Sequence, residues 1–254
     1  MALLLGVDTG GTFTDAVLYD EAKGAVLAKA KALTTHRDLA VGVAGAIDAV
    51  LAEARGAEVA LVSLSTTLAT NALVEGQGDA AALVLIGFEE ADLDRAGLRE
   101  ALGGAPALMI AGGHRSDGGE AAAFDAEALR RGLAGLAGEV DALAVAGVFA
   151  VRNPAHETAA RDVAAAELGL PVTCSHELSA KLGGPRRALT TLLNARLVCM
   201  IHRLIEATEG LLAARGIGAP LMVVRGDGAL MGAAVARARP IETILSGPAA
   251  SVVG

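Results

Sequence analysis

A ten-residue segment near the N-terminus combines glycines, hydroxyls and carboxylates at a spacing suited to phosphate binding. Gly6-Val7-Asp8-Thr9-Gly10-Gly11-Thr12-Phe13-Thr14-Asp15 joins two β-like runs at residues 3–7 and 12–19. Adjacent glycines let the backbone turn tightly and approach a bulky anion without a Cβ in the way. Their amides can form a nest for phosphate oxygens, to which the hydroxyls of Thr12 and Thr14 would add donors. The segment is predicted to bind phosphate, although a plain β-hairpin would also tolerate Asp-Thr-Gly-Gly.

The two carboxylates of this segment suggest a cation. A carboxylate repels phosphate unless a cation lies between them, and Mg²⁺ takes one or two carboxylates while keeping most of its waters. Asp8, at the end of the first strand, is therefore the predicted magnesium ligand. Asp15 would assist it or orient the loop.

Three further polar residues follow the buried run at residues 59–63. Thr66, Thr67 and Asn71 open a short predicted helix over residues 66–75, a natural position for an anion or a substrate. The alternative is that Thr66 or Thr67 only caps that helix.

Several residues later in the chain are candidates for the site, and each has a functional and a structural interpretation. Asp227, in a Gly-Asp-Gly turn after the run at residues 221–224, either presents a carboxylate to a ligand crevice or only makes the turn. Ser246 and Gly247 are predicted to line the cleft or act as a hinge. His156 and Glu157 could form an acid–base pair, but an N-terminal helix position explains Glu157 as well.

The elements that must position these residues follow an α/β pattern. Strand-like runs at 3–7, 12–19 and 25–33 precede a helical run at 38–55, the run at 59–63 and the short helix, which is the order of a ribonuclease-H-like unit. Further strand-like runs lie at 81–88, 108–111, 143–149 and 171–174. A long helical pattern covers 186–215, with a possible break at Gly210. The predicted domains are 1–180 and 181–254, with the boundary near Gly183-Gly184.

Composition excludes some classes of function. The chain has a net charge of −8 and 2% aromatic residues, which argues against a nucleic-acid partner. Its apolar runs are shorter than 18 residues, so no membrane span is expected. Cys174 and Cys199 have no metal-ligand spacing and suit a reducing compartment. With no signal-peptide pattern at the N-terminus, a cytoplasmic location is expected.

The N-terminal segment resembles the first phosphate loop of the actin/hexokinase/heat-shock-protein-70 ATPases, and in detail the hydantoinase A / oxoprolinase branch. Further stretches that resemble that branch are Ser65–Leu73, Asn153–Glu157, Arg186–Ala195, Val224–Gly228 and Leu245–Ala249. The resemblance runs from Gly6 to Gly254. One departure is Leu64-Ser65, where the family often has His-Gly, and this puts the substrate or the chemistry in question.

The resemblance implies an actin-like ATPase N-terminal lobe with an additional α/β segment and the beginning of a second lobe. It implies ATP and Mg²⁺ as cofactors, and ATP-dependent hydrolysis of a cyclic amide of the hydantoin or 5-oxoproline type. Gly10, Gly11 and Thr12 would then contact phosphate, with Thr9, Thr14, Asp15, Ser246 and Gly247 completing the nucleotide site. Asp8, Thr66, Thr67, Asn71 and Asp227 would serve catalysis.

The resemblance also implies a B-type subunit as partner, and a homo-oligomer is possible. Family members continue with a second Asp-x-Gly-Gly-Thr loop that these 254 residues lack. The expectation is therefore a fragment or truncated relative that does not complete the nucleotide cleft alone. The alternatives are a small-molecule kinase of the same superfamily and a non-catalytic, nucleotide-responsive binding module.

Overall fold

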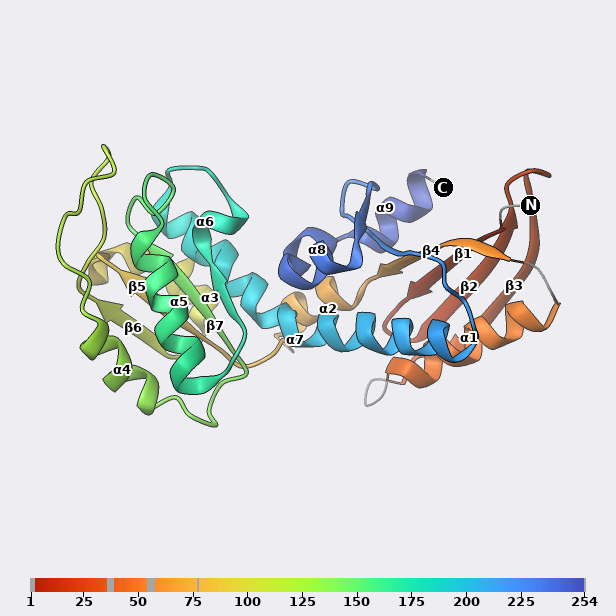
Figure 1. Cartoon of the computed structure of the whole chain (residues 1–254), viewed down its shortest axis with the longest axis horizontal. Coiled ribbons are helices and arrows are strands. Elements are labelled where there is room, and N and C mark those ends of the chain that lie inside the picture. Colours follow the sequence, from red (N-terminus) through yellow and green to blue (C-terminus); the bar gives the residue numbers. More distant parts are fainter. Residues whose placement is uncertain (1–2, 36–38, 54–57, 77, 254) are drawn as a thin grey trace. The chain divides into compact units, whose positions relative to one another are not determined.

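The computed structural model describes residues 3–35, 39–53, 58–76 and 78–253 (Figure 1). The chain forms two compact units, which are Met1–Gln77 together with Met200–Gly254, and Gly78–Cys199. This division differs from the predicted boundary near residue 180, because the C-terminal segment returns to the first sheet and pairs with it. We call them the first and the second unit.

The first unit is built on a mixed six-stranded sheet. Its strands are β1 (Leu3–Thr9), β2 (Phe13–Asp20), β3 (Ala25–Leu33), β4 (Val59–Thr66), β9 (Leu221–Val224) and β10 (Leu230–Gly232). They lie in the order β10-β9-β4-β1-β2-β3. The β1–β2, β2–β3 and β9–β10 pairs are antiparallel, whereas β1–β4 and β4–β9 are parallel. The predicted ribonuclease-H-like order of strands and helices is confirmed.

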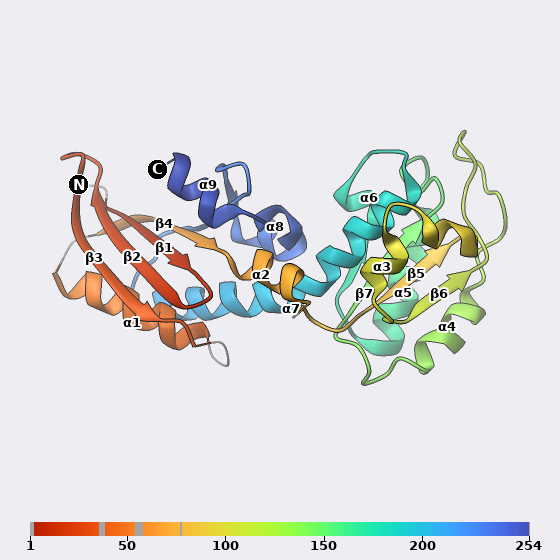
Figure 2. The ribbon, with the colours of Figure 1, turned by 180° about the vertical axis from the view of Figure 1, so that it is seen from behind.

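Helices cover both faces of this sheet. They are α1 (Leu39–Glu53), α2 (Leu68–Glu75), α8 (Ala233–Ala238), the 3₁₀ helix η2 (Pro240–Thr243), α9 (Ser246–Val253) and the last part of α7 (Gly184–Ala214). Within this unit, α1 lies on one side of the sheet and α8 and α9 on the other (Figures 1 and 2). Buried residues alternate along β1, from Leu3 to Thr9. The intervening positions, Asp8 among them, therefore lie on the opposite face of the strand.

The second unit has a four-stranded parallel sheet in the order β6-β5-β7-β8. Its elements are β5 (Ala81–Ile86), η1 (Glu90–Asp94), α3 (Leu98–Leu102), β6 (Ala107–Ile110), α4 (Ala126–Ala134), β7 (Ala142–Gly147), α5 (Ala155–Leu168), β8 (Val172–Cys174) and α6 (Ser175–Leu178). All residues of β5 and β7 are buried, as expected for strands covered on both faces. Apolar side chains of α3 and α7 pack on one face, and those of α4 and α5 on the other.

The structure shows a side-chain cap at one helix and corrects one helix prediction. Asp125 caps α4, since its Oδ1 accepts a hydrogen bond from the Ala128 N–H at 2.8 Å. The expected break at Gly210 is absent, because α7 is one helix of 31 residues. A single glycine inside a helix lowers its stability but does not end it when tertiary packing holds the helix.

The long helix α7 also bears on the membrane prediction. By length and composition alone it could cross a bilayer, a property that the shorter uninterrupted apolar runs did not reveal. Half of its most apolar window is buried inside the protein, and Arg187, Thr191 and Asn194 are buried polar residues on it. This is the pattern of a core helix, which passes the same test.

Candidate phosphate-binding site

The Asp8 carboxylate lies at the carboxyl end of β1, facing two neighbouring strands. Ser65 is its register partner on β4, and the Ser65 hydroxyl donates to Asp8 Oδ1 at 2.6 Å. Asp15 is its register partner on β2 and forms an ion pair with Lys31 at 3.2 Å. Two carboxylates directly opposite each other repel. Lys31 already offsets the Asp15 charge, whereas Asp8 has no cationic partner among the described residues, so its carboxylate can take a bound cation.

The turn after β1 offers free backbone donors. The Gly10 N–H donates to the carbonyl of Phe13 at 2.9 Å and closes the turn. No described residue accepts a hydrogen bond from the N–H of Gly11 or Thr12. Two consecutive free amides beside a glycine turn are suited to phosphate oxygens, and together with Asp8 they fit a phosphate and its Mg²⁺.

The structure does not bring every predicted donor to this turn. Thr14 is fully buried, and its hydroxyl is 3.0 Å from that of Thr34. Thr14 adjoins Asp15 on β2, and successive side chains of a strand point to opposite faces, so the Thr14 hydroxyl lies on the face away from Asp15. Thr9 is also fully buried, and its Oγ1 has no partner among the described residues. The geometry gives neither hydroxyl a phosphate contact.

The junction between β4 and α2 lies against the turn. The Thr9 carbonyl accepts hydrogen bonds from the Thr67 N–H at 3.1 Å and the Thr66 hydroxyl at 3.0 Å. Thr66 Oγ1 in turn accepts from the Leu68 N–H at 3.0 Å. Thr66 thus ends β4 and satisfies an amide of the helix, as the capping alternative stated. Thr67 precedes α2 and makes no side-chain capping bond, which leaves its hydroxyl available.

The start of α9 is fixed to the same junction. Ser246 is fully buried, and its hydroxyl donates to the Thr66 carbonyl at 2.8 Å and accepts from the Thr66 N–H at 3.1 Å. A Cβ at Gly247 would lie 2.7 Å from Thr67 Cγ2 and 3.6 Å from Asp8 Oδ1. Ser246 therefore positions the helix, whereas Gly247 permits its close approach to Asp8.

Asp227 lies in the turn between β9 and β10. Its Oδ1 accepts from the Ala229 N–H at 3.0 Å, and its Oδ2 pairs with Arg225 Nη2 at 3.2 Å. Because β9 is parallel to β4, this turn follows the same carboxyl edge of the sheet as the residues around Asp8. The structure gives Asp227 a turn-forming role, and its exposed carboxylate remains at that edge.

Sequence reasoning missed Ser65, which holds Asp8. The signal was the departure from the family's His-Gly at Leu64-Ser65. Leu64 is fully buried in the core, and the adjacent Ser65 contacts the candidate cation ligand. The alternation of a strand decides which of the two residues faces Asp8.

The contact between the turn and α2 gives a testable expectation. A Cβ at Gly11 would lie 2.9 Å from Asn71 Nδ2, so Gly11→Ala is expected to displace the Asn71 amide and crowd the phosphate position. We expect at least about a tenfold weaker binding of Mg·ATP, corresponding to about 1.4 kcal/mol, measured by calorimetric titration. The control is Gly210→Ala, where a Cβ meets open space and a gain of about 0.5–1 kcal/mol in stability is expected. Unchanged affinity in Gly11→Ala would contradict the placement of phosphate at this turn.

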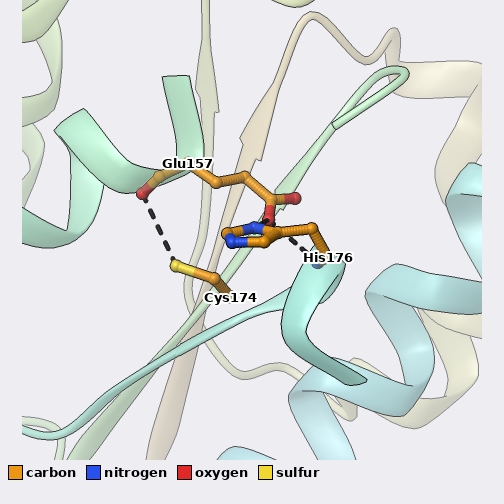
Figure 3. Close-up of side chains that lie close together, drawn as sticks. All are labelled: Glu157, Cys174 and His176. Carbon is orange, nitrogen blue, oxygen red and sulfur yellow. Dashed lines mark hydrogen bonds and ion pairs between the residues drawn. The ribbon is translucent and has the colours of Figure 1, made fainter. Parts of the chain in front are cut away.

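The second unit contains a buried polar cluster around Glu157, near the end of its sheet (Figure 3). Glu157 is fully buried, and its Oε1 accepts from the Gly147 N–H at 2.6 Å and the Ser175 hydroxyl at 2.5 Å. Its Oε2 accepts from the His176 N–H at 3.0 Å and from His176 Nδ1 at 2.5 Å. Arg187 completes the cluster, donating to the Gly147 carbonyl at 2.8 Å and to Ser175 Oγ at 3.3 Å. Burial lowers the pKa of the Arg187 guanidinium, and the nearby Glu157 carboxylate opposes that shift.

His156, which precedes Glu157 in the sequence, is not part of this cluster and does not form the predicted acid–base pair with Glu157. The His156 ring accepts from the Gly113 N–H at 2.9 Å through Nδ1, and its Nε2 is 2.9 Å from Glu120. Cys174 lies close to Glu157 and His176, but burial raises the pKa of its thiol to about 12. A protonated thiol is a poor metal ligand, and the Glu157 oxygens already accept four hydrogen bonds. The arrangement is that of a structural network.

Comparisons with known proteins agree with the resemblance. The family model described as the hydantoinase/oxoprolinase N-terminal region matches residues 4–168, and the hydantoinase/oxoprolinase model matches residues 187–254. The caprolactamase subunit alpha of Pseudomonas jessenii is 31% identical over 271 aligned positions, covering 97% of this chain and 38% of that protein. The acetophenone carboxylase gamma subunit of Aromatoleum aromaticum is 29% identical over 285 aligned positions, covering 98% of this chain and 38% of that protein.

Two solved structures share the fold. Nucleotide-free acetone carboxylase matches with a TM-score of 0.81 at 19% identity, covering 99% of this chain and 40% of that chain. The ATP-dependent caprolactamase from Pseudomonas jessenii matches with a TM-score of 0.78 at 31% identity, covering 98% of this chain and 39% of that chain. The chain thus spans about two fifths of the length of these relatives. It belongs to the hydantoinase/oxoprolinase family and has the actin-like ATPase fold.

Proposed function

We propose that this chain forms the phosphate-binding part of an ATP-dependent enzyme that activates the carbonyl oxygen of a cyclic amide. The observation that carries the proposal is the turn after β1, where the free N–H groups of Gly11 and Thr12 adjoin the Asp8 carboxylate. Amides hold phosphate oxygens and the carboxylate holds the cation that neutralises them. Two relatives support the proposal by their names: acetone carboxylase and caprolactamase are both described as ATP-dependent, and both names refer to a carbonyl compound.

Each residue of the site has a part in this proposal. Asp8 would hold Mg²⁺, with Ser65 fixing the orientation of its carboxylate. Gly11 and Thr12 would donate to phosphate, and Thr67 and Asn71 would face the reacting carbonyl. Mg·ATP would supply the phosphoryl group that turns the carbonyl oxygen of a resonance-stabilised amide into a leaving group. The residues themselves position phosphate and neutralise charge, which is the main contribution of a protein to this chemistry.

A partner and a location complete the proposal. Two relatives are named as an alpha and a gamma subunit, so we expect a B-type subunit to complete the enzyme and open the activated ring. Neither Cys174 nor Cys199 forms a disulfide, in keeping with a reducing cytoplasm.

The test is calorimetric titration of Mg·ATP and Mg·ADP into this chain and into the full-length gene product. We expect binding in the full-length product, and ATP turnover when a cyclic amide and the B-type partner are added. A stable phosphorylated product without ring opening would favour a small-molecule kinase. Absence of nucleotide binding in both proteins would contradict the ATPase proposal and would favour the alternative of a non-catalytic binding module.

A further inference from the structure

A pocket of about 480 Å³ lies beside the phosphate turn in the first unit. Gly11 and Thr12 form one side of it, and α2 forms another through Asn71 and Glu75. Asp8 is not part of its lining, so the pocket adjoins the proposed phosphate position without coinciding with it. Its volume suits a small ring compound, since ligand pockets start at about 300 Å³.

Two polar side chains of the pocket lie one helical turn apart. Asn71 and Glu75 are at positions i and i+4 of α2, which places their Cβ atoms about 5–6 Å apart on one face. No described residue hydrogen-bonds to the side-chain amide of Asn71 or pairs with the carboxylate of Glu75. An amide that can donate and a carboxylate that can only accept thus stand side by side without protein partners.

The remaining lining is apolar. Leu68 and Ala72 are buried residues of α2, and Met200 of α7 adds a flexible thioether side chain. Such a wall suits ring methylenes, whose burial contributes about 0.8 kcal/mol per CH₂ group. The pocket therefore combines an apolar wall with the Asn71 amide donor and the Glu75 acceptor, next to the free N–H groups of Gly11 and Thr12.

A small cyclic amide matches this combination. A ring of seven or fewer atoms forces the amide bond to be cis, so the carbonyl oxygen and the N–H lie on the same edge. An open-chain secondary amide is trans, because cis costs about 2.5–4 kcal/mol, and its C=O and N–H point to opposite edges. Glu75 is exposed at the edge of the pocket, and a ketone, which has no N–H, makes no hydrogen bond to its carboxylate.

We propose that Asn71 and Glu75 together recognise the cis-amide edge of a lactam-type substrate, Asn71 donating to the carbonyl oxygen and Glu75 accepting from the N–H. This rests on the proposed function for the identity of the reacting carbonyl, and it adds Glu75 as the residue that selects amides over ketones. The bond to the carboxylate is charge-assisted and therefore the stronger of the two. The position of the pocket beside Gly11 would hold the carbonyl next to the phosphate turn.

The experiment measures binding of four matched compounds to this chain by ligand-observed nuclear magnetic resonance, without nucleotide. They are ε-caprolactam, N-methylcaprolactam, cycloheptanone and N-ethylbutanamide, of which only the first has a cis N–H. We expect caprolactam to bind at least about tenfold more tightly than the other three, the effect of one hydrogen bond worth about 1.4 kcal/mol. Glu75→Met should lower the affinity for caprolactam to that for its N-methyl derivative. Glu75→Gln keeps an acceptor oxygen and should retain part of the preference for caprolactam.

The control is Glu21→Met, an exposed carboxylate in the turn after β2, which should leave the preference unchanged. Equal binding of all four compounds, or binding of none, would overturn the inference. So would a loss of Mg·ATP affinity in Glu75→Met, since the pocket would then hold part of the nucleotide. Failure of the wild-type protein to bind Mg·ATP, with the lactam preference intact, would instead overturn the proposed function alone.

Discussion

Asp8→Asn is expected to lower the affinity of the full-length protein for Mg²⁺ in the presence of ATP by about 10- to 100-fold, the range for losing a partner of a metal site. The amide retains an oxygen that accepts from Ser65, so the geometry of the strand pair is preserved while the charge is lost. The measurement is the Mg²⁺ dependence of ATP binding and turnover. Asp162→Asn, an exposed position of α5, is the control and should show no change.

The same substitution should have the opposite effect on stability. Asp8 lies directly opposite Asp15 in the β1–β2 pair, and like charges at such positions destabilise a sheet by about 0.2–1 kcal/mol. Without Mg²⁺, Asp8→Asn should therefore unfold at a slightly higher denaturant concentration than the wild type. A protein that loses both stability and Mg²⁺ affinity would indicate that Asp8 is a structural residue, and the cation assignment would be wrong.

Glu157→Gln is expected to destabilise the second unit by about 3–5 kcal/mol, the usual cost of breaking a buried charged cluster by changing one member. Four donors surround the Glu157 oxygens. A glutamine NH₂ group would face two of these donors and leave them buried without an acceptor. Because Arg187 shares Ser175 and Gly147 with Glu157, its buried guanidinium would also lose its compensating charge.

Urea unfolding followed by circular dichroism measures this difference. The control is Glu177→Gln, which removes a partly exposed ion pair with Arg161 and should cost no more than about 1 kcal/mol. An equal unfolding midpoint for Glu157→Gln and the wild type would show that the cluster does not hold β7, β8, α5 and α7 together.

Much of the first unit could be predicted from the sequence because its signals are local. The strand at Ala25–Leu33 and the one at Leu221–Val224 have the predicted bounds, since turn residues flank short apolar runs there. The family and the ribonuclease-H-like order followed from motifs that are contiguous in the chain. The glycine turn after β1 was also predictable, because glycine pairs act through their own backbone.

The domain division and the side-chain roles needed the tertiary structure. The C-terminal segment pairs with β4 across about 150 residues of chain, and no local pattern indicates which sheet a strand joins. Thr14 and Asp15 are neighbours in sequence but lie on opposite faces of β2, so only one of them faces Asp8.

The sequence by itself thus indicated the family and the order of strands and helices along the chain, and it gave Asp8 as the candidate cation ligand, which stays a prediction. Only the tertiary structure showed that Ser65 holds Asp8, that Ser246 fixes α9 to the end of β4, and that Glu157 belongs to a buried network. The physical reason is that a backbone turn is encoded by adjacent residues, whereas hydrogen bonds between side chains depend on strand register and on packing between distant segments.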